Sequence, residues 1–223
     1  AIMHWQESKG EPGNRLPFVQ CSHMTNTMIV PILSFGNNNM DWEWRYGYSD
    51  FQDRFSADLT VAQTLGRQVG AWGTILSGGH HKRDDPRTER VYRTRAAVCL
   101  VHEIRDYDYR PAWKNELYKK LFAWGYGGPR CTVYNYWEKP HPVAVTGVDA
   151  RTLVMKKDEA AVVIVSSYGE EGTARCKLDL DTLGLDADVT GRNFEQDKQV
   201  KRTAPGTFTF ALPKHDFRII EVK

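Results

Sequence analysis

Long apolar runs are missing from this 223-residue sequence. No stretch approaches the roughly 18 consecutive apolar residues that a membrane-spanning helix needs, and the start AIMHWQESKG lacks the basic-then-apolar layout of a signal peptide. A charge excess is missing too, because 30 Lys and Arg residues stand against 28 Asp and Glu residues, a formal net charge of +2. The interleaved charges offer no large positive face to a phosphate backbone. We therefore expect a soluble protein that binds neither membranes nor nucleic acids.

Cysteine is scarce, and the four cysteines are far apart in the sequence: Cys21, Cys99, Cys131 and Cys176. No C-x-x-C occurs, so neither a zinc knuckle nor a redox pair is expected. Cys99 lies in an apolar helical run and is expected to be a buried free thiol, while one disulfide among the others stays open. The motifs G-x-S-x-G, G-x-x-x-x-G-K-[ST], G-x-G-x-x-G and H-E-x-x-H are also absent. We expect no cofactor and no metal.

The first part of the chain alternates strand-like and helix-like segments. The run over 28–35 is almost continuously apolar, as in a strand buried on both faces of a parallel sheet, although Pro31 weakens this assignment. Caps and stop residues mark the helices. The expected elements are strands over 1–5, 28–35 and 71–76, a helix from Ser56 to Gly70, a helix opened by Asp85-Pro86, and a helix from Pro111 to Gly125. This rhythm is typical of an α/β sheet or barrel.

After Gly127-Gly128-Pro129 the pattern changes to short runs rich in β-branched and aromatic residues. These runs cover 131–137, 152–156, 161–167, 174–180, 207–212 and 217–222, with turn residues between them. Such a pattern is typical of an antiparallel β-sandwich. We place a domain boundary near residue 129, which gives domains over 1–128 and 129–223.

A complete (β/α)8 barrel takes about 250 residues, far more than precede residue 129. The predicted fold class is therefore α/β plus all-β: the last two or three β/α units of a TIM barrel, followed by an antiparallel sandwich. We expect the N-terminal remainder of the barrel as a partner of this chain.

The most informative loop follows the apolar run and reads Gly36 to Tyr46, with Asp41, Trp42, Glu43 and Trp44 in succession. Residues two apart in an extended segment share a side and lie about 6.6 Å apart, so Asp41 and Glu43 would face one cleft. Two converging carboxylates are the minimal equipment of glycoside hydrolysis, and indoles suit the apolar faces of sugars. The alternative is that both carboxylates form ion pairs with Arg45 or Arg54, with the tryptophans in the core.

Histidines supply weaker candidates for substrate contacts. His80 and His81 lie in the loop after the expected strand 71–76, where they could reach a sugar hydroxyl; two adjacent histidines cannot easily bind one metal ion. His4 closes the first expected strand. His23 precedes an apolar strand, a position that more often stabilises than reacts. The remaining histidines are expected to be structural: His102, His141 and His215.

Several stretches resemble a family. The segments 23–35, 41–43, 50–55 and 66–70 resemble bacterial proteins described as glycoside-hydrolase-domain proteins, and the tail 212–222 is similar to the closing strand of α-galactosidase- and α-amylase-type enzymes. The resemblance implies a barrel with a C-terminal sandwich, a carbohydrate substrate, and an extracellular or periplasmic location. Asp41-Trp42-Glu43 also resembles the D-x-E of substrate-assisted hexosaminidases and chitinases, in which the Asp orients and the Glu is the acid.

Two functions from different classes remain open at this point. The leading one is glycoside hydrolysis with Glu43 as acid and Asp41 as its partner; the sugar, the anomer and the choice between retaining, inverting and substrate-assisted mechanisms stay open. The alternative is a non-catalytic carbohydrate-binding or structural module. An open pocket beside the indoles would favour the enzyme, and carboxylates buried against arginines would favour the module.

Overall fold

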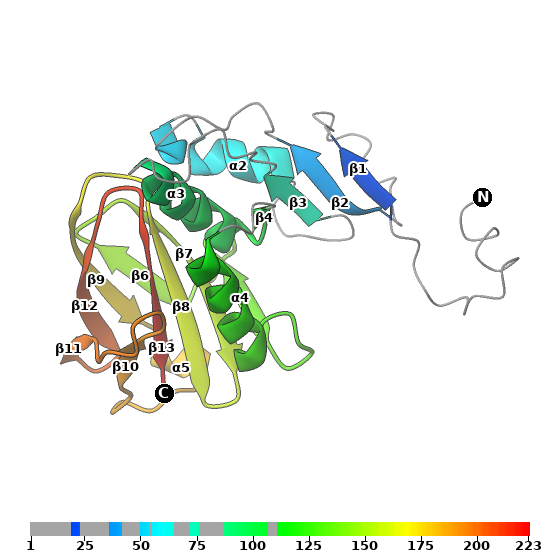
Figure 1. The fold of residues 1–223 in the computed structure, drawn as a ribbon. Helices are drawn as coiled ribbons and strands as arrows, with labels where there is room; N and C mark the ends of the chain where they lie inside the picture. The colour runs from blue at the N-terminus through cyan, green and yellow to red at the C-terminus, as the bar shows by residue number, and fades with distance from the viewer. Residues whose placement is uncertain are drawn as a thin grey trace, which may run out of the picture.

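The computed structural model describes residues 19–22, 36–41, 50–53, 55–64, 72–75, 87–106 and 111–223. Within these ranges, no helix combines the length and the apolar character that a membrane crossing requires. The described chain divides into a parallel sheet, a set of helices and two antiparallel sheets (Figure 1).

The parallel sheet has the strand order β1-β2-β3-β4. Its strands are β1 (Val19–Ser22), β2 (Gly36–Asp41), β3 (Trp72–Ile75) and β4 (Arg105–Asp106), and each pairs in parallel with the next. The prediction of a loop from Gly36 is wrong, because β2 occupies 36–41. Pairing on both sides, to β1 and β3, overrides the low strand propensity of its asparagines. The strands predicted over 1–5 and 28–35 lie outside the described residues.

Two helix ends that the sequence predicts, at Ser56 and Gly125, are confirmed. The predicted end at Gly70 and the predicted opening at Asp85-Pro86 lie outside the described residues. The helices are the 3₁₀ helix η3 (Phe51–Asp53), α2 (Ala57–Thr64), α3 (Arg87–His102) and α4 (Ala112–Trp124). Ser56 caps α2 by accepting a hydrogen bond at Oγ from the Leu59 backbone N–H, at 3.2 Å. Gly125 ends α4 with φ +129°, where its N–H donates to the carbonyls of Leu121 and Phe122. Only glycine adopts this backbone without strain.

The sandwich consists of two antiparallel sheets, and it confirms the predicted fold of this part. One sheet has the order β10-β13-β8-β7-β5, with β5 (Thr132–Asn135), β7 (Ala150–Lys157), β8 (Ala160–Ser167), β10 (Gly191–Asn193) and β13 (Phe217–Val222). The other has the order β11-β12-β9-β6, with β6 (Val143–Thr146), β9 (Gly172–Leu178), β11 (Lys201–Ala204) and β12 (Thr207–Leu212).

Several short elements were not predicted. In the sandwich they are β6, β10, β11 and the single-turn helix α5 (Leu180–Leu183). Each is only three or four residues long, too short for alternation or helical spacing to stand out from the surrounding turns. Predicted strands over 207–212 and 217–222 match β12 and β13 at both ends.

The five-stranded sheet is buried on both faces. Alternate side chains such as Val154 and Val163 point into the sandwich interior and pack with Phe208 of the second sheet. The intervening residues, among them Leu153 and Ile164, pack on the other face against helices α3 and α4. In Figure 1, α4 lies across β7 and β8 on this face. The predicted domain ranges 1–128 and 129–223 therefore share one hydrophobic core.

The prediction for Cys99 is confirmed, since it is a free thiol in α3 with no exposed surface. Burial raises the pKa of this thiol, which keeps it protonated and unreactive. Cys131 and Cys176 are also free, so the cysteines of the described sandwich form no disulfide.

Candidate functional site

The carboxyl ends of the parallel strands define the edge where barrel enzymes place their chemistry. Asp41 is the last residue of β2 and aligns with Ile75, the last residue of β3. Ile75 in turn aligns with Asp106, the last residue of β4. The strand register thus brings a predicted catalytic residue, Asp41, to the carboxyl edge of a parallel sheet.

The other predicted site residues lie outside the described part of the chain. This holds for the acid candidate and for all predicted substrate contacts: Glu43, His4, His23, Trp42, Trp44, His80 and His81. Their roles stay predictions, as does the role of the Asp41 carboxylate.

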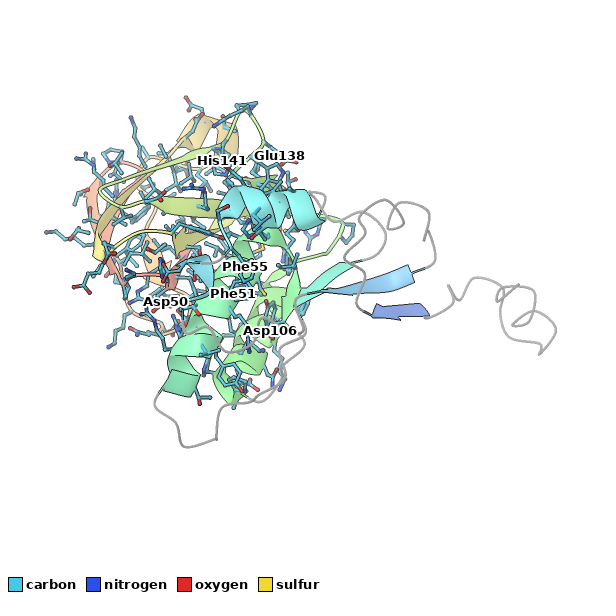
Figure 2. All side chains as sticks on the ribbon, turned by 90° about the horizontal axis from the view of Figure 1, so that it is seen from above. Asp50, Phe51, Phe55, Asp106, Glu138 and His141 are labelled. Atoms are coloured by element: carbon cyan, nitrogen blue, oxygen red, sulfur yellow. The ribbon has the colours of Figure 1, made fainter. Side chains whose placement is uncertain are left out.

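A second carboxylate at this edge, Asp106, was not singled out from the sequence. Its side chain has no exposed surface, and its Oδ2 lies 2.9 Å from Nζ of Lys114 and 3.3 Å from Nε of Arg95. Both cationic side chains are almost completely buried. Because Arg95 belongs to α3 and Lys114 to α4, the carboxylate faces the helices, beside which Figure 2 places it.

The triad of Asp106, Arg95 and Lys114 has a structural role. The Asp106 carboxylate lies between two buried cations and has no exposed surface, so it is shielded from water and substrate. Asp106 therefore cannot serve as the proton donor of a glycosidase. Its sequence context, Ile104-Arg105-Asp106, gave no signal because β4 has only two residues.

A cavity of about 230 Å³ lies beside the triad. Its lining is mainly apolar and comes from α3, α4 and the five-stranded sheet, including Leu100, Leu121, Leu153 and Met155. At its wall, Glu103 accepts hydrogen bonds from Tyr126 Oη at 3.4 Å and from Asn135 Nδ2 at 3.1 Å. Both carboxylate oxygens of Glu103 thus have partners within the protein, so Glu103 does not orient a sugar in this cavity.

His102 joins the helix layer to the sandwich. It is fully buried at the end of α3, with Nδ1 2.8 Å from the Val98 carbonyl and Nε2 2.9 Å from Tyr136 Oη. A carbonyl can only accept, so Nδ1 carries the proton and the Tyr136 hydroxyl donates to Nε2. Burial lowers the pKa of His102 to about 4. The ring is thus a neutral structural bridge at physiological pH.

The remaining two histidines lie in turns of the sandwich. His141 precedes β6; its Nδ1 lies 2.9 Å from the Val143 carbonyl, and burial lowers its pKa. His215 lies in the turn between β12 and β13, where it meets Asp50 and Asp53 from the region of η3. Nothing in the sequence linked these three residues.

Comparisons place the fold among known proteins. No protein-family model and no curated protein sequence matches the chain. Among solved structures, the GH27 β-L-arabinopyranosidase of Geobacillus stearothermophilus matches with a TM-score of 0.58 at 12% identity, covering 100% of this chain and 52% of that one. A maltogenic α-amylase of Thermotoga neapolitana matches with a TM-score of 0.52 at 11% identity, covering 99% of this chain and 57% of that one.

These likenesses define the fold. The chain has the architecture of the C-terminal part of a TIM-barrel glycosidase followed by a β-sandwich, which confirms the predicted fold class. It spans about half the length of the structures it matches. At such identities the fold is shared with carbohydrate-active enzymes, while the reaction of this chain has to be argued from its residues.

Proposed function

We propose that this chain belongs to a glycoside hydrolase, with Glu43 as the general acid and Asp41 as its partner. The observation that carries the proposal is the position of Asp41, which closes β2 at the carboxyl edge of a parallel sheet. In barrel enzymes, catalytic side chains come from this edge and from the loops that follow it. The shared fold with an arabinopyranosidase and an amylase supports a glycosidic substrate.

The chemistry follows from two carboxyl groups with different protonation states. The acid protonates the glycosidic oxygen as the bond to the leaving sugar breaks, while the ionised partner attacks the anomeric carbon, activates water or orients a substrate group. A separation of about 5 Å between the carboxyl groups favours retention, and about 6.5–9.5 Å favours inversion. Trp42 and Trp44 would stack on the sugar, and the histidine candidates would contact its hydroxyls.

The rest of the active site would come from the complementary part of the barrel. The chain covers 52% of the arabinopyranosidase and 57% of the amylase. Since barrel carboxylates usually come from different strands, an N-terminal half of the barrel could supply the true partner of Glu43. In that case Asp41 would orient substrate instead of reacting with it.

The test is turnover of a panel of aryl α- and β-glycosides by the intact protein carrying Glu43→Gln or Asp41→Asn. Loss of an acid that protonates the leaving group lowers kcat at least about 100-fold. The matched control is Glu171→Gln, an exposed glutamate in the turn before β9, which should leave turnover unchanged. If both active-site variants turn over like the wild type, the assignment is wrong. Glycan binding without any hydrolysis across the panel would favour a carbohydrate-binding module.

A further inference from the structure

A cluster of three possible metal ligands lies where η3 meets the sandwich. Asp50 immediately precedes η3, Asp53 ends it, and His215 lies in the turn between β12 and β13. One ligand atom from each residue can be chosen so that all three lie within 4.8 Å of one another. Figure 2 shows Asp50 beside Phe51 at this point of the chain.

The histidine is the unusual member of the cluster. His215 is 3% exposed, and its Nδ1 is buried without a hydrogen-bond partner. The Asp50 Oδ1 atom lies 3.6 Å from Nδ1, and Asp53 Oδ1 lies 3.6 Å from Nε2. Both distances are too long for hydrogen bonds. A buried ring nitrogen that faces a carboxylate without bonding to it is unfavourable unless another group lies between them.

The backbone around the cluster is held in place by other contacts. Gln52, between the two aspartates, donates from Nε2 to the carbonyl of His215 at 3.2 Å and to that of Thr94 at 3.1 Å. Arg93 of α3 pairs with Asp216, the next residue in the turn, at 2.8 Å. These contacts fix the backbone that carries the three residues before any ligand binds, which reduces the ordering cost of binding.

The charges around the cluster leave it negative. Arg90 neutralises Asp50 by contacting its Oδ1 atom at 2.7 and 2.9 Å. Lys214 lies close enough to act on both aspartates but pairs with Glu170. Among the described residues, Asp53 forms no ion pair with an arginine or lysine, and its side chain is 58% exposed. One carboxylate charge is thus open to a cation from solvent.

We propose that Asp50, Asp53 and His215 form a divalent-cation site of the zinc type, which joins η3 to the β12–β13 turn. One imidazole nitrogen and two carboxylate oxygens are a donor set that Zn²⁺ accepts, with water completing the tetrahedron. One zinc ion binds only one of the two ring nitrogens, and we assign it to Nδ1, the nitrogen that faces Asp50 at 3.6 Å. At Zn–ligand distances of about 2.1 Å, neighbouring ligand atoms lie about 3.4 Å apart, close to this distance. Asp53 Oδ1 lies nearer to Nε2, so its exposed side chain would turn toward the ion to complete the set. Ca²⁺ and Mg²⁺ take oxygen ligands, so an imidazole in the set selects against them.

The experiment is a zinc titration of the chelator-treated 223-residue chain, followed by calorimetry and by thermal unfolding. At zinc concentrations about 100-fold above Kd, Tm should rise by about 5 °C, and Ca²⁺ or Mg²⁺ at the same concentration should not raise it. Asp53→Asn removes the exposed ligand and should weaken zinc binding at least about tenfold. Asp58→Asn, an exposed aspartate in α2, is the matched control and should bind zinc like the wild type.

A second ligand variant, His215→Asn, tests the site independently of Asp53→Asn. His215 has a positive φ of +51°, a backbone that asparagine tolerates, so His215→Asn keeps the turn while removing the nitrogen ligand. It should also lose zinc binding. Absence of zinc binding in the wild type would overturn the proposal, as would unchanged binding in both variants. If acid alone raises Tm and zinc does not, the ring is an imidazolium held between two carboxylates and the proposal is wrong.

Discussion

The two faces of the five-stranded sheet are built differently. The inner face meets the second sheet mainly through apolar side chains, such as Val154, Val163 and Phe208. The outer face meets α3 and α4 through apolar residues too, but buried polar groups lie alongside them: the Asp106 triad and the His102–Tyr136 hydrogen bond. Apolar contact stabilises without fixing direction, whereas buried ion pairs and hydrogen bonds have required geometry. The helix junction should therefore be the more sensitive to small chemical changes.

The largest effect is expected from Asp106→Asn. The substitution keeps the shape of the side chain but removes the negative charge shared by Arg95 and Lys114, whose side chains are 4% and 3% exposed. Breaking a buried pair by removing one partner typically costs 3–5 kcal/mol, so we expect the free energy of unfolding to fall by about 4 kcal/mol. Urea denaturation of the 223-residue chain measures this loss.

The control for this variant is Asp158→Asn. Asp158 pairs with Arg130 at 3.3 Å, but the two side chains are 58% and 72% exposed. Exposed pairs contribute little, so the change should stay within about 0.5 kcal/mol. An Asp106→Asn protein as stable as this control would show that the triad does not hold the helices.

An intermediate effect is expected from two neighbouring positions on opposite faces of β7. Leu153 and Val154 are both completely buried, Leu153 against the helices and Val154 in the sandwich interior. Leu153→Ala should cost about 3 kcal/mol and Val154→Ala about 2 kcal/mol, because each leaves a cavity in proportion to the atoms removed. Urea denaturation of both variants compares the faces directly. A cost near zero for Leu153→Ala alone would mean that the helices do not cover the sheet in solution.

The sequence predicts best those elements whose own residues decide their structure. Strand β8 is continuously apolar over 160–165 because both faces of its sheet are buried, and such a run stands out in a sequence. The helix ends follow from Ser56 and Gly125, which act through local hydrogen bonds. Strand β2 could not be predicted in this way, since its asparagines are extended only through pairing with β1 and β3.

The site is less predictable because its partners are distant in the chain. Gln52 and His215, 163 positions apart, meet beside the cluster proposed to bind zinc, and no spacing rule links them. The prediction that the chain holds no metal rested on local motifs, which such a cluster does not contain. Asp41, by contrast, is predicted from its local context, since the D-x-E pattern needs only neighbouring residues, and its role stays a prediction.

The smallest expected effect is the pH dependence of the free energy of unfolding. It tests whether the hydrogen-bonded pair His102–Tyr136 at the helix junction stays neutral in the folded protein. Burial lowers the pKa of His102 from 6.5 to about 4 in the folded protein. The unfolded chain therefore takes up a proton near pH 6.5 while the folded ring stays neutral. Stability from the neutral ring is complete above pH 6.5 and is lost as the pH falls toward 4. Between pH 7.5 and 5 the loss should be about 2 kcal/mol.

Urea denaturation of the wild type and of His102→Gln at several pH values isolates this contribution. Glutamine does not titrate, and its amide can still donate to the Val98 carbonyl and accept from Tyr136, the two partners of the histidine. Other groups, including His141, titrate in both proteins and cancel in the difference. The free energy of unfolding of the variant should fall less steeply with acid, by about 2 kcal/mol over this range. Equal slopes would mean that His102 takes up its proton in the folded protein as readily as in the unfolded chain, so that burial does not lower its pKa.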